Sequence, residues 1–304
     1  MEFVDQNNTL PIPFVLCDVF GEQPFAGNQL AVFPDGSTLL DGQMAAVARE
    51  FGWSEITFVL PGKVPRLRIW TPSGELPFAG HPTVGTAVVL ALEEQLPTGP
   101  TVLELGIGAV EVDVTLTGPA AGEATMTQRA PEFEVVFEDR RLLAQVLGLL
   151  EEDLAPALPA QLISTGLPHF LVPIRSNAAL ARAQPRPDLF PALAMEIGVH
   201  WMYLFTVDTP ESNRAARARL LGVGPEDPAT GSAAGPLGAY LVRYGLHRAG
   251  EMEIEQGMEM GRPSLIRVDV PLIAGEIGAV KVSGQVHVWG RGELLPMHST
   301  EPTK

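Results

Sequence analysis

Two stretches of the sequence match each other at a constant separation of about half the chain. The first, ELPFAGHPTVGTAVVLA, runs from Glu75 to Ala91, and the second, EDPATGSAAGPLGAYLV, runs from Glu226 to Val242. Ser232 lies 151 residues after His81, and the same separation applies, without a gap, to further identities. These are Arg66 with Arg217, Arg68 with Arg219, Glu75 with Glu226, Pro77 with Pro228, Gly80 with Gly231, Leu90 with Leu241, and Gly106 with Gly257. The repeat predicts two similar halves related by a pseudo-twofold axis, with a cleft between them.

The pattern of apolar residues indicates an α+β fold. VEVDVTL, LIRVDVPL and VKVSGQVHVW alternate apolar and polar residues, as half-buried strands do. The segments after His81 and Ser232 lack alternation and are rich in small residues, so we expect each half to be a curved, mostly antiparallel sheet wrapped around a central helix. DGQMAAVAREFG and RRLLAQVLGLL predict two more helices.

The repeat also suggests where the domains begin and end. We expect residues 1–125 to form the N-terminal domain and residues 126–277 the C-terminal domain. A last strand, at about residues 278–295, could complete the first domain. The stretch from Thr117 to Glu134 contains Pro and Gly and is predicted to be the interdomain linker.

Composition and charge exclude several classes of protein. The chain of 304 residues is 46% hydrophobic and 18% charged, which is typical of a folded protein. Its net charge of −16 and its lack of a basic run argue against a nucleic-acid partner. MEFVDQNNTL has neither the basic nor the apolar region of a signal peptide. The longest apolar run, Val84 to Leu92, is about half of a membrane span. We therefore expect a cytoplasmic protein without a membrane partner.

The cysteine and histidine content restricts the chemistry of the site. Cys17 is the one cysteine, which excludes an internal disulfide, a Cys-rich zinc site and a pair of catalytic thiols within the chain. It lies in the strand-like FVLCDVF, where a buried, unreactive thiol is expected. The six histidines form no metal-ligand spacing, and no nucleotide-binding glycine motif is complete. We expect no metal site.

The two matched stretches place Gly80-His81 and Gly231-Ser232 at helix N-termini. Free backbone N–H groups and the positive end of the helix dipole make such termini anion sites. Glycine allows close approach of a ligand, and Pro82 suits a first helical turn. Each terminus alone could be an ordinary N-cap. Because the repeat aligns both, they are predicted to face one cleft and to bind a small carboxylate.

Two carboxyl groups are further candidates. Glu55 stands in FGWSEITFVL between apolar residues, and desolvation there would raise its pKa toward neutrality and suit it to proton transfer. It could equally be an exposed glutamate at a turn. Asp227 could cap the second helix, or contact substrate or His81 across the cleft. Glu226 and Glu75 are more simply partners for the matched arginines.

Several motifs together resemble the PhzF-like isomerase family of phenazine biosynthesis. They are DVFGEQPFAGNQLAVF, SEITFV, RIWTPSGELPFAGHPTVGTA, GVGPEDPATGSA and QGMEMGRPS, in order from Asp18 to Ser264. The resemblance implies the diaminopimelate-epimerase-like fold, a homodimer and no cofactor. It also implies that Glu55 moves a proton between two carbons of a substrate such as a dihydro-hydroxyanthranilate. His81, Asp227 and Ser232 match the other site residues of the family.

The predicted function is therefore a cofactor-independent isomerase of a small cyclic or amino-acid-like carboxylate. Asn28 and His169 are further candidates for lining the site, although local turn hydrogen bonds would explain them as well. Trp53 and Ile56 depart from the family pattern beside Glu55 and could reshape the pocket. The alternatives are a racemase or epimerase on the same scaffold, or a non-catalytic carboxylate-binding protein.

Overall fold

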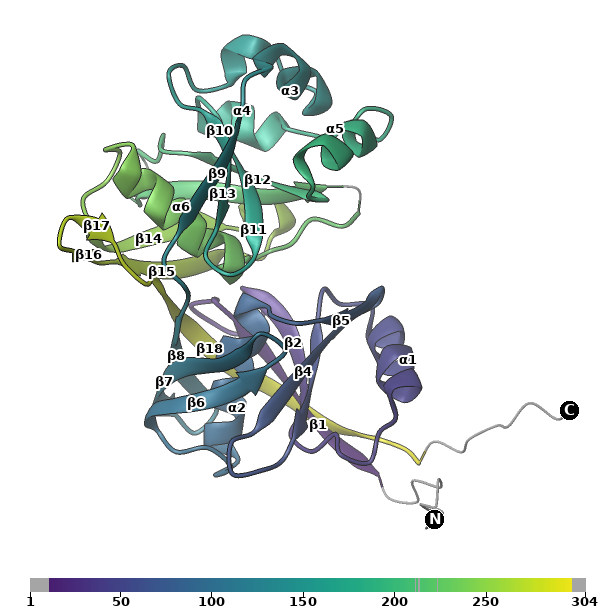
Figure 1. The fold of residues 1–304 in the computed structure, drawn as a ribbon. Helices are drawn as coiled ribbons and strands as arrows, with labels where there is room; N and C mark the ends of the chain where they lie inside the picture. Colours follow the sequence, from purple (N-terminus) through teal and green to yellow (C-terminus); the bar gives the residue numbers. More distant parts are fainter. Residues whose placement is uncertain (1–10, 211, 213, 223, 297–304) are drawn as a thin grey trace, which may run out of the picture.

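The chain folds into two lobes that lie one above the other, as Figure 1 shows. The computed structural model describes residues 11–210, 212, 214–222 and 224–296. The expected cytoplasmic location rests in part on the polar N-terminal stretch, and that stretch lies outside the described residues. Strand β18 (Lys281–Leu294) runs between the lobes and pairs with strands of both.

The lower lobe in Figure 1 is a barrel that encloses helix α2. Its strands pair in the order β1-β2-β3-β4-β6-β7-β8-β18, and β1 also pairs with β18, which closes the sheet. Its elements are β1 (Ile12–Val19), β2 (Asn28–Phe33), α1 (Asp41–Phe51), β3 (Ile56–Leu60), β4 (Arg66–Thr71), β5 (Gly74–Leu76), α2 (Gly80–Leu92), β6 (Gly99–Leu105), β7 (Gly108–Gly118) and β8 (Ala121–Thr127).

The upper lobe repeats this arrangement around helix α6. The order β10-β11-β12-β13-β14-β15-β18 has the same succession of antiparallel and parallel pairs as β1-β2-β3-β4-β6-β7-β8. Its elements are β9 (Glu132–Phe137), α3 (Arg140–Val146), η1 (Glu151–Asp153), β10 (Ala160–Ser164), β11 (Pro168–Pro173), α4 (Asn177–Arg182), α5 (Phe190–Ile197), β12 (Trp201–Thr206), β13 (Ala216–Gly222), α6 (Gly231–Arg243), β14 (Gly250–Gln256), η2 (Met258–Met260), β15 (Ser264–Val270), β16 (Leu272–Ile273) and β17 (Glu276–Ile277). The expectation of two pseudo-symmetric α+β halves is confirmed.

The central helices are buried because their side chains are small. Every residue of α2 from Gly80 to Ala91 is buried, as is every residue of α6 from Gly231 to Leu241. A Cβ atom on Gly85 would lie 2.6 Å from Leu30 Cδ2, so the sheet packs directly against the helix backbone there. A helix that is apolar on all sides must be enclosed, and here the curved sheet encloses it.

The matched residues of the repeat have matched structural roles. Arg68 makes two hydrogen bonds to Glu75, of 2.7 and 2.6 Å. Arg219 makes two to Glu226, both of 2.8 Å. The prediction that these glutamates pair with the matched arginines is confirmed. Two-point guanidinium–carboxylate pairs hold the segment before each central helix to the neighbouring strand.

One prediction about the connection between the halves is right only in part. Most of the stretch from Thr117 to Glu134 is not a linker, because it contains β8, which pairs with β7 and β18. Gly118 and Pro119 mark a tight hairpin instead, and Gly122, Ala124 and Met126 alternate as buried strand residues. The chain passes between the lobes within residues 128–131. The domain limits given above stay a prediction.

The remaining elements cover the outer faces of the sheets. Helix α1 lies on the lower lobe, and α3, α4 and α5 lie on the upper lobe (Figure 1). The helices predicted at DGQMAAVAREFG and RRLLAQVLGLL are present as α1 and α3, whereas α4 and α5 were not foreseen. Cys17 is fully buried in β1, as expected. Within the described part of the chain, no helix is both long and apolar enough to cross a membrane.

Candidate active site

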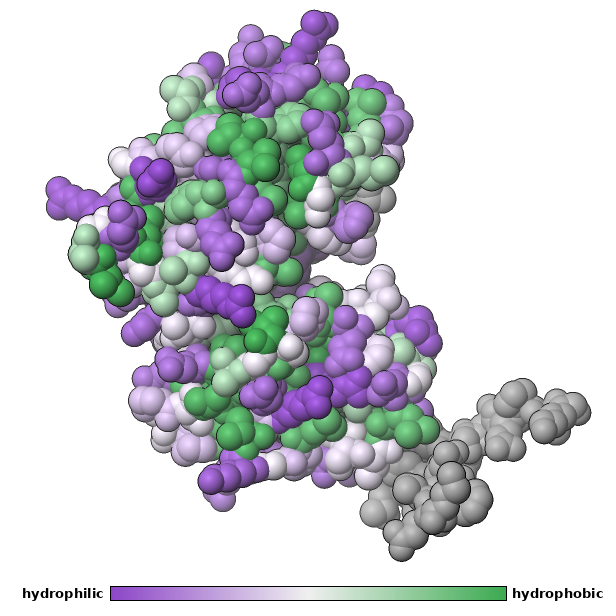
Figure 2. Space-filling view, viewed as in Figure 1, coloured by the Kyte–Doolittle hydropathy of each residue, from purple (hydrophilic) through white to green (hydrophobic). Residues whose placement is uncertain are grey.

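The N-termini of α2 and α6 meet at the junction of the two lobes. A Cβ atom on Gly80 would lie 2.6 Å from the backbone nitrogen of Ser232 and 3.0 Å from Gly231 Cα. Glycine at position 80 is therefore what allows the two helix ends to approach this closely. Figure 2 shows that the surface is indented where the lobes meet.

Glu55 and His81 face each other beside these helix ends. Glu55 immediately precedes β3, and 18% of its side chain is exposed. Its Oε2 atom lies 3.8 Å from His81 Nε2. Both atoms are buried and have no hydrogen-bond partner among the residues that the structure describes. Burying a polar atom without a partner costs about 1–3 kcal/mol, so this pair of atoms is suited to receive a ligand.

Asn28 joins the two lobes within the site. Its Nδ2 atom donates to Asp227 Oδ1 at 2.7 Å and to the Ala229 carbonyl at 3.0 Å, and lies 3.2 Å from His81 Nδ1. Thr230 Oγ1 donates to the other Asp227 oxygen at 2.5 Å. Asp227 therefore does not cap α6 directly, and its contact across the junction is with Asn28 rather than with His81.

Ser232 and His169 form the corresponding pair in the upper lobe. His169 Nε2 lies 3.0 Å from Ser232 Oγ, and both residues are buried. His169 lies near the start of β11 and Asn28 at the start of β2, and these strands are equivalent in the two halves. In each half, a polar side chain from this strand therefore contacts the residue at the start of the central helix.

Burial controls the protonation of the four titratable groups. It raises the pKa of Glu55 to about 8, and the charge of Asp227 adds to this effect. It also raises the pKa of Asp227 to about 6, against the hydrogen bonds from Thr230 and Asn28. Burial lowers the pKa of His81 to about 3 and that of His169 to about 4, so both rings are uncharged at neutral pH. Two carboxyl groups whose charges affect each other and which titrate one after the other can hold and release a single proton.

All eight candidate residues thus form one connected cluster. Glu55, His81, Asn28 and Asp227 are linked in series on one side of the helix ends. Gly80, Gly231, Ser232 and His169 form the other side. None of the eight is a Lys or Arg, so the donors that this set offers a carboxylate are neutral ones, including the backbone N–H groups of the two helix ends.

Sequence reasoning missed the polar residues that hold this cluster in place. Gln256 accepts from the Thr230 N–H at 3.0 Å and donates to the Asp227 carbonyl at 2.8 Å. Gln128 donates to the Gly231 carbonyl at 2.9 Å. Ser54 Oγ donates to Asn28 Oδ1 at 3.3 Å. Gln256 lies in the motif QGMEMGRPS and Ser54 in SEITFV, so both could have been found there. Gln128 contacts a residue 103 positions away in the sequence, and no local pattern marks that contact.

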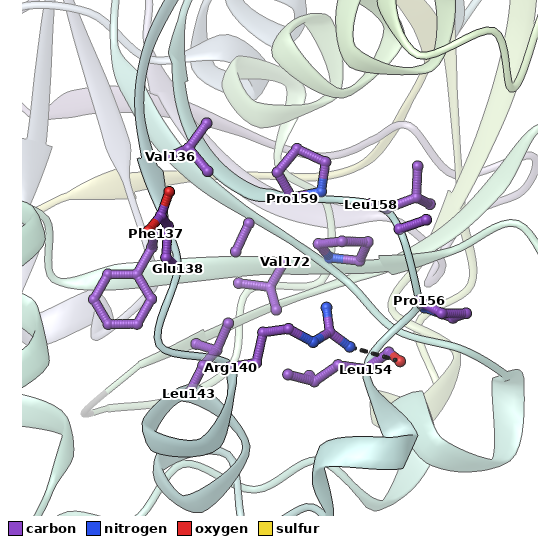
Figure 3. Close-up of a pocket in the computed structure, with 13 residues that line it drawn as sticks. Val136, Phe137, Glu138, Arg140, Leu143, Leu154, Pro156, Leu158, Pro159 and Val172 are labelled. Carbon is purple, nitrogen blue, oxygen red and sulfur yellow. Dashed lines mark hydrogen bonds between the residues drawn. The ribbon is translucent and has the colours of Figure 1, made fainter.

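An apolar pocket lies away from this cluster, at the outer end of the upper lobe. It has a volume of about 480 Å³, and Figure 3 shows Arg140 at its edge, where the guanidinium donates to the Leu154 carbonyl. None of the eight candidate residues lines it. Among the described residues, no group of three or more His, Cys, Asp or Glu side chains is arranged to hold a metal ion.

Comparisons with known proteins cover almost the whole chain. The model of the family described as Phenazine biosynthesis-like protein matches residues 17–291. A trans-2,3-dihydro-3-hydroxyanthranilate isomerase of Pseudomonas fluorescens is 35% identical over 93% of this chain and 99% of its own.

Solved structures of the same kind have the same fold. One is described as a predicted epimerase of Pseudomonas aeruginosa. It has a TM-score of 0.83 and 36% identity, over 93% of this chain and 99% of its own. A Bacillus anthracis protein described as a phenazine biosynthesis protein of the PhzF family has a TM-score of 0.84 and 26% identity, over 94% and 99%. The fold is the diaminopimelate-epimerase-like fold expected from the sequence.

Proposed function

The chain belongs to the phenazine biosynthesis-like protein family, whose relatives include named isomerases, and on that premise we propose that it is a cofactor-independent isomerase. In this proposal it moves a proton between two carbons of a small cyclic or amino-acid-like carboxylate. The proposal extends to the residues that carry the reaction. Glu55 is the general base and then the general acid, with His81, Asp227 and Ser232 as its partners in the site.

One observation carries this proposal. The buried and unpartnered atoms Glu55 Oε2 and His81 Nε2 lie 3.8 Å apart, next to two helix N-termini that abut each other. A proton carrier and a site for negative charge are therefore adjacent. Isomerisation of a carboxylate by proton transfer requires this combination.

The geometry supports a simple sequence of steps. The ionised carboxylate of Glu55 takes a proton from one substrate carbon and becomes a neutral carboxylic acid. The electron pair left behind moves into the conjugated system, and the proton returns from Glu55 to a different carbon while the double bond shifts. A pKa near 8 makes both proton loss and proton return accessible near neutral pH.

The other residues bind and orient the substrate in this proposal. The backbone N–H groups at Gly80-His81 and Gly231-Ser232 hold the carboxylate or the developing enolate-like charge, in an oxyanion-hole role. The uncharged His81 ring hydrogen-bonds to the substrate. Asp227, which is held by Asn28, positions an amine or hydroxyl group. His169 supports Ser232 through the bond between Nε2 and Oγ.

Proton NMR in heavy water tests the proposal. Wild type should introduce deuterium at a carbon of dihydro-hydroxyanthranilate, or of a related compound in a small panel of amino-acid-like carboxylates. The exchange rate of Glu55→Gln should be about 10³-fold lower than that of wild type, because general acid–base groups contribute about 10²–10⁴-fold to a rate. The variant should still bind the compound in a calorimetric titration. Glu50→Gln on the exposed face of α1 is the matched control and should exchange like wild type. Exchange by Glu55→Gln at the wild-type rate would overturn the role of Glu55.

The position of the deuterium separates the isomerase from an epimerase on the same scaffold. An epimerase removes and returns the proton at one carbon, which requires two groups, and the observation in favour of it is a second buried carboxyl group, Asp227, whose charge raises the pKa of Glu55. Deuterium at a second carbon supports the isomerase. Deuterium at the original carbon with inversion supports the epimerase. Tight binding without exchange would support a carboxylate-binding protein.

The finer expectations about partners and location belong to the same proposal. We infer that the protein acts as a homodimer in the cytoplasm, on a small-molecule carboxylate, as the family resemblance implies. Light scattering of the purified protein distinguishes a dimer from a monomer.

A further inference from the structure

Arg262 bridges the two lobes next to the candidate site. It belongs to residues 257–264 of the upper lobe, which follow β14, contain η2 and end at the first residue of β15; we call them the loop of residues 257–264. Its Nη2 atom contacts Asp18 Oδ1 of β1 in the lower lobe at 2.6 Å. Its Nε atom donates to the Gly27 carbonyl at 2.7 Å, and Nη2 also donates to the Ala26 carbonyl at 3.2 Å. These contacts fix the backbone immediately before Asn28.

The same loop is also attached to the backbone immediately after Asp227. Ser264 Oγ donates to the Pro228 carbonyl at 2.9 Å. Gly257, with φ +78°, passes so close to this carbonyl that a Cβ atom there would lie 2.6 Å from Pro228 O. The loop of residues 257–264 therefore holds Asn28 from one side and Asp227 from the other.

The partner of Arg262 is held firmly. Asp18 is 1% exposed, and its second oxygen accepts the Phe25 N–H at 2.6 Å. Arg262 itself is 19% exposed in its side chain. Breaking a buried ion pair leaves an uncompensated charge, so the arrangement of Asp18, Arg262 and the Ala26-Gly27 carbonyls has little freedom to shift.

We propose that Arg262 is a positioning residue for the site. By holding Asp18 and the Ala26-Gly27 backbone to the upper lobe, it sets the contact between Asn28 and Asp227, and through Asp227 the placement of the carboxyl pair with Glu55. Arg262 does not touch the reacting atoms. The effect on turnover depends on the proposed function, whereas the effect on Asn28 does not.

NMR of the Asn28 side-chain amide tests the proposal without a substrate. This resonance is identified by its absence in Asn28→Asp. In Arg262→Gln it should shift from its wild-type position, because the hydrogen bonds from Arg262 to the carbonyls of residues 26 and 27 are lost, while the Gly27 N–H stays bonded to the Pro263 carbonyl. In Arg262→Lys the shift should be smaller, because the positive charge beside Asp18 is kept while the planar two-point contact is lost.

Turnover gives the second readout. Arg262→Gln should lower kcat for the exchange reaction by about tenfold to a hundredfold, because small misplacements of reacting groups cost about 10²-fold. KM should change by less than about threefold, because the helix ends that bind the carboxylate are unaltered. Arg262→Lys should recover part of kcat.

Arg217→Gln is the matched control. Arg217 pairs with Glu259 of the same loop at 2.9 Å, and its side chain is 23% exposed, similar to Arg262, but both partners lie in the upper lobe. It should leave the Asn28 resonance in place and kcat within about twofold of wild type.

The outcomes separate this inference from the proposed function. An unmoved Asn28 resonance in Arg262→Gln would overturn the inference, as would an equal shift in Arg217→Gln. If wild type turns over no compound while the Asn28 resonance still shifts in Arg262→Gln alone, the positioning role stands and the proposed reaction fails. If Arg262→Gln does not fold, Asp18→Asn removes the partner charge with little change of shape and should shift the same resonance.

Discussion

Single residues in the site are tuned by burial rather than by ion pairs. Burial is the largest cause of the raised pKa of Glu55 and of Asp227, and the two histidines of the cluster are uncharged at neutral pH. An ionised carboxylate in such a site lowers the stability of the folded protein, because it is worse solvated there than in water. The cost is tolerated at a functional site.

The stability of the protein should depend on pH through Glu55. The folded protein raises the pKa of Glu55 from 4.5 to about 8. The carboxylic acid therefore binds its proton more tightly in the folded than in the unfolded chain. The stability linked to that proton is fully present below about pH 4.5 and is lost as the pH rises toward 8. Glu55→Gln cannot ionise and should be more stable than wild type at pH 8.5, by on the order of 5 kcal/mol.

Urea unfolding of both proteins at pH 4.5 and pH 8.5 measures this difference. It should nearly vanish at pH 4.5, where wild-type Glu55 is protonated in the folded state and about half protonated in the unfolded chain. A difference that is the same at both pH values would show that Glu55 is not held protonated by burial.

At the scale of elements, the site exists because two helices begin at the same place. Each central helix starts with glycine, and each is preceded by a segment that an Arg–Glu pair holds to the sheet. The small side chains that let α2 and α6 lie inside curved sheets also let their N-termini approach each other. The packing of the core and the construction of the site therefore depend on the same residues.

Gly80→Ala should show how close this approach is. The new methyl group would overlap backbone atoms of Gly231 and Ser232, which cannot rotate away. We expect a loss of about 2 kcal/mol in the free energy of unfolding, together with reduced exchange activity.

Gly42→Ala on α1 is the matched control for this change. No atom lies within 4 Å of a Cβ at Gly42, which is exposed within a helix. It should stabilise the protein by about 0.5 kcal/mol, because alanine restricts the unfolded chain and favours the helix. Urea unfolding measures both variants. Equal stability of Gly80→Ala and wild type would mean that the two helix ends do not abut.

At the scale of the whole molecule, one strand makes the two lobes interdependent. β18 pairs with β1 and β8 of the lower lobe and with β15 of the upper lobe. Its buried residues Val282, Val286 and Val288 belong to the same core as the two central helices. The lower barrel cannot close without this strand, and the upper sheet loses an edge pairing without it.

The two lobes should therefore unfold together. Differential scanning calorimetry of wild type should give a single transition whose calorimetric and van't Hoff enthalpies agree. Two resolved transitions, or a van't Hoff enthalpy of about half the calorimetric value, would show that the lobes fold independently in spite of β18.

The sequence by itself determined the fold class, the repeat and the identity of the candidate cluster. Glycine, proline and paired charges have few interchangeable alternatives, so an internal match at these residues predicts backbone geometry directly. The separation of 151 residues carries α2 onto α6 and β6 onto β14 without a shift. The alternation in VEVDVTL predicted β7, because the burial of a strand follows its period of two.

Only the tertiary structure decided how the two halves meet. Asn28 bonds to Asp227 across 199 residues, and Arg262 to Asp18 across 244, and no local pattern encodes such pairs. The predicted linker was too long for a related reason. Gly118 and Pro119 show that the chain turns, but whether it then leaves the sheet or pairs with it depends on β18, which lies far along the chain. The charge state of Glu55 was likewise left open by its neighbours in sequence, because burial is a property of the assembled lobes.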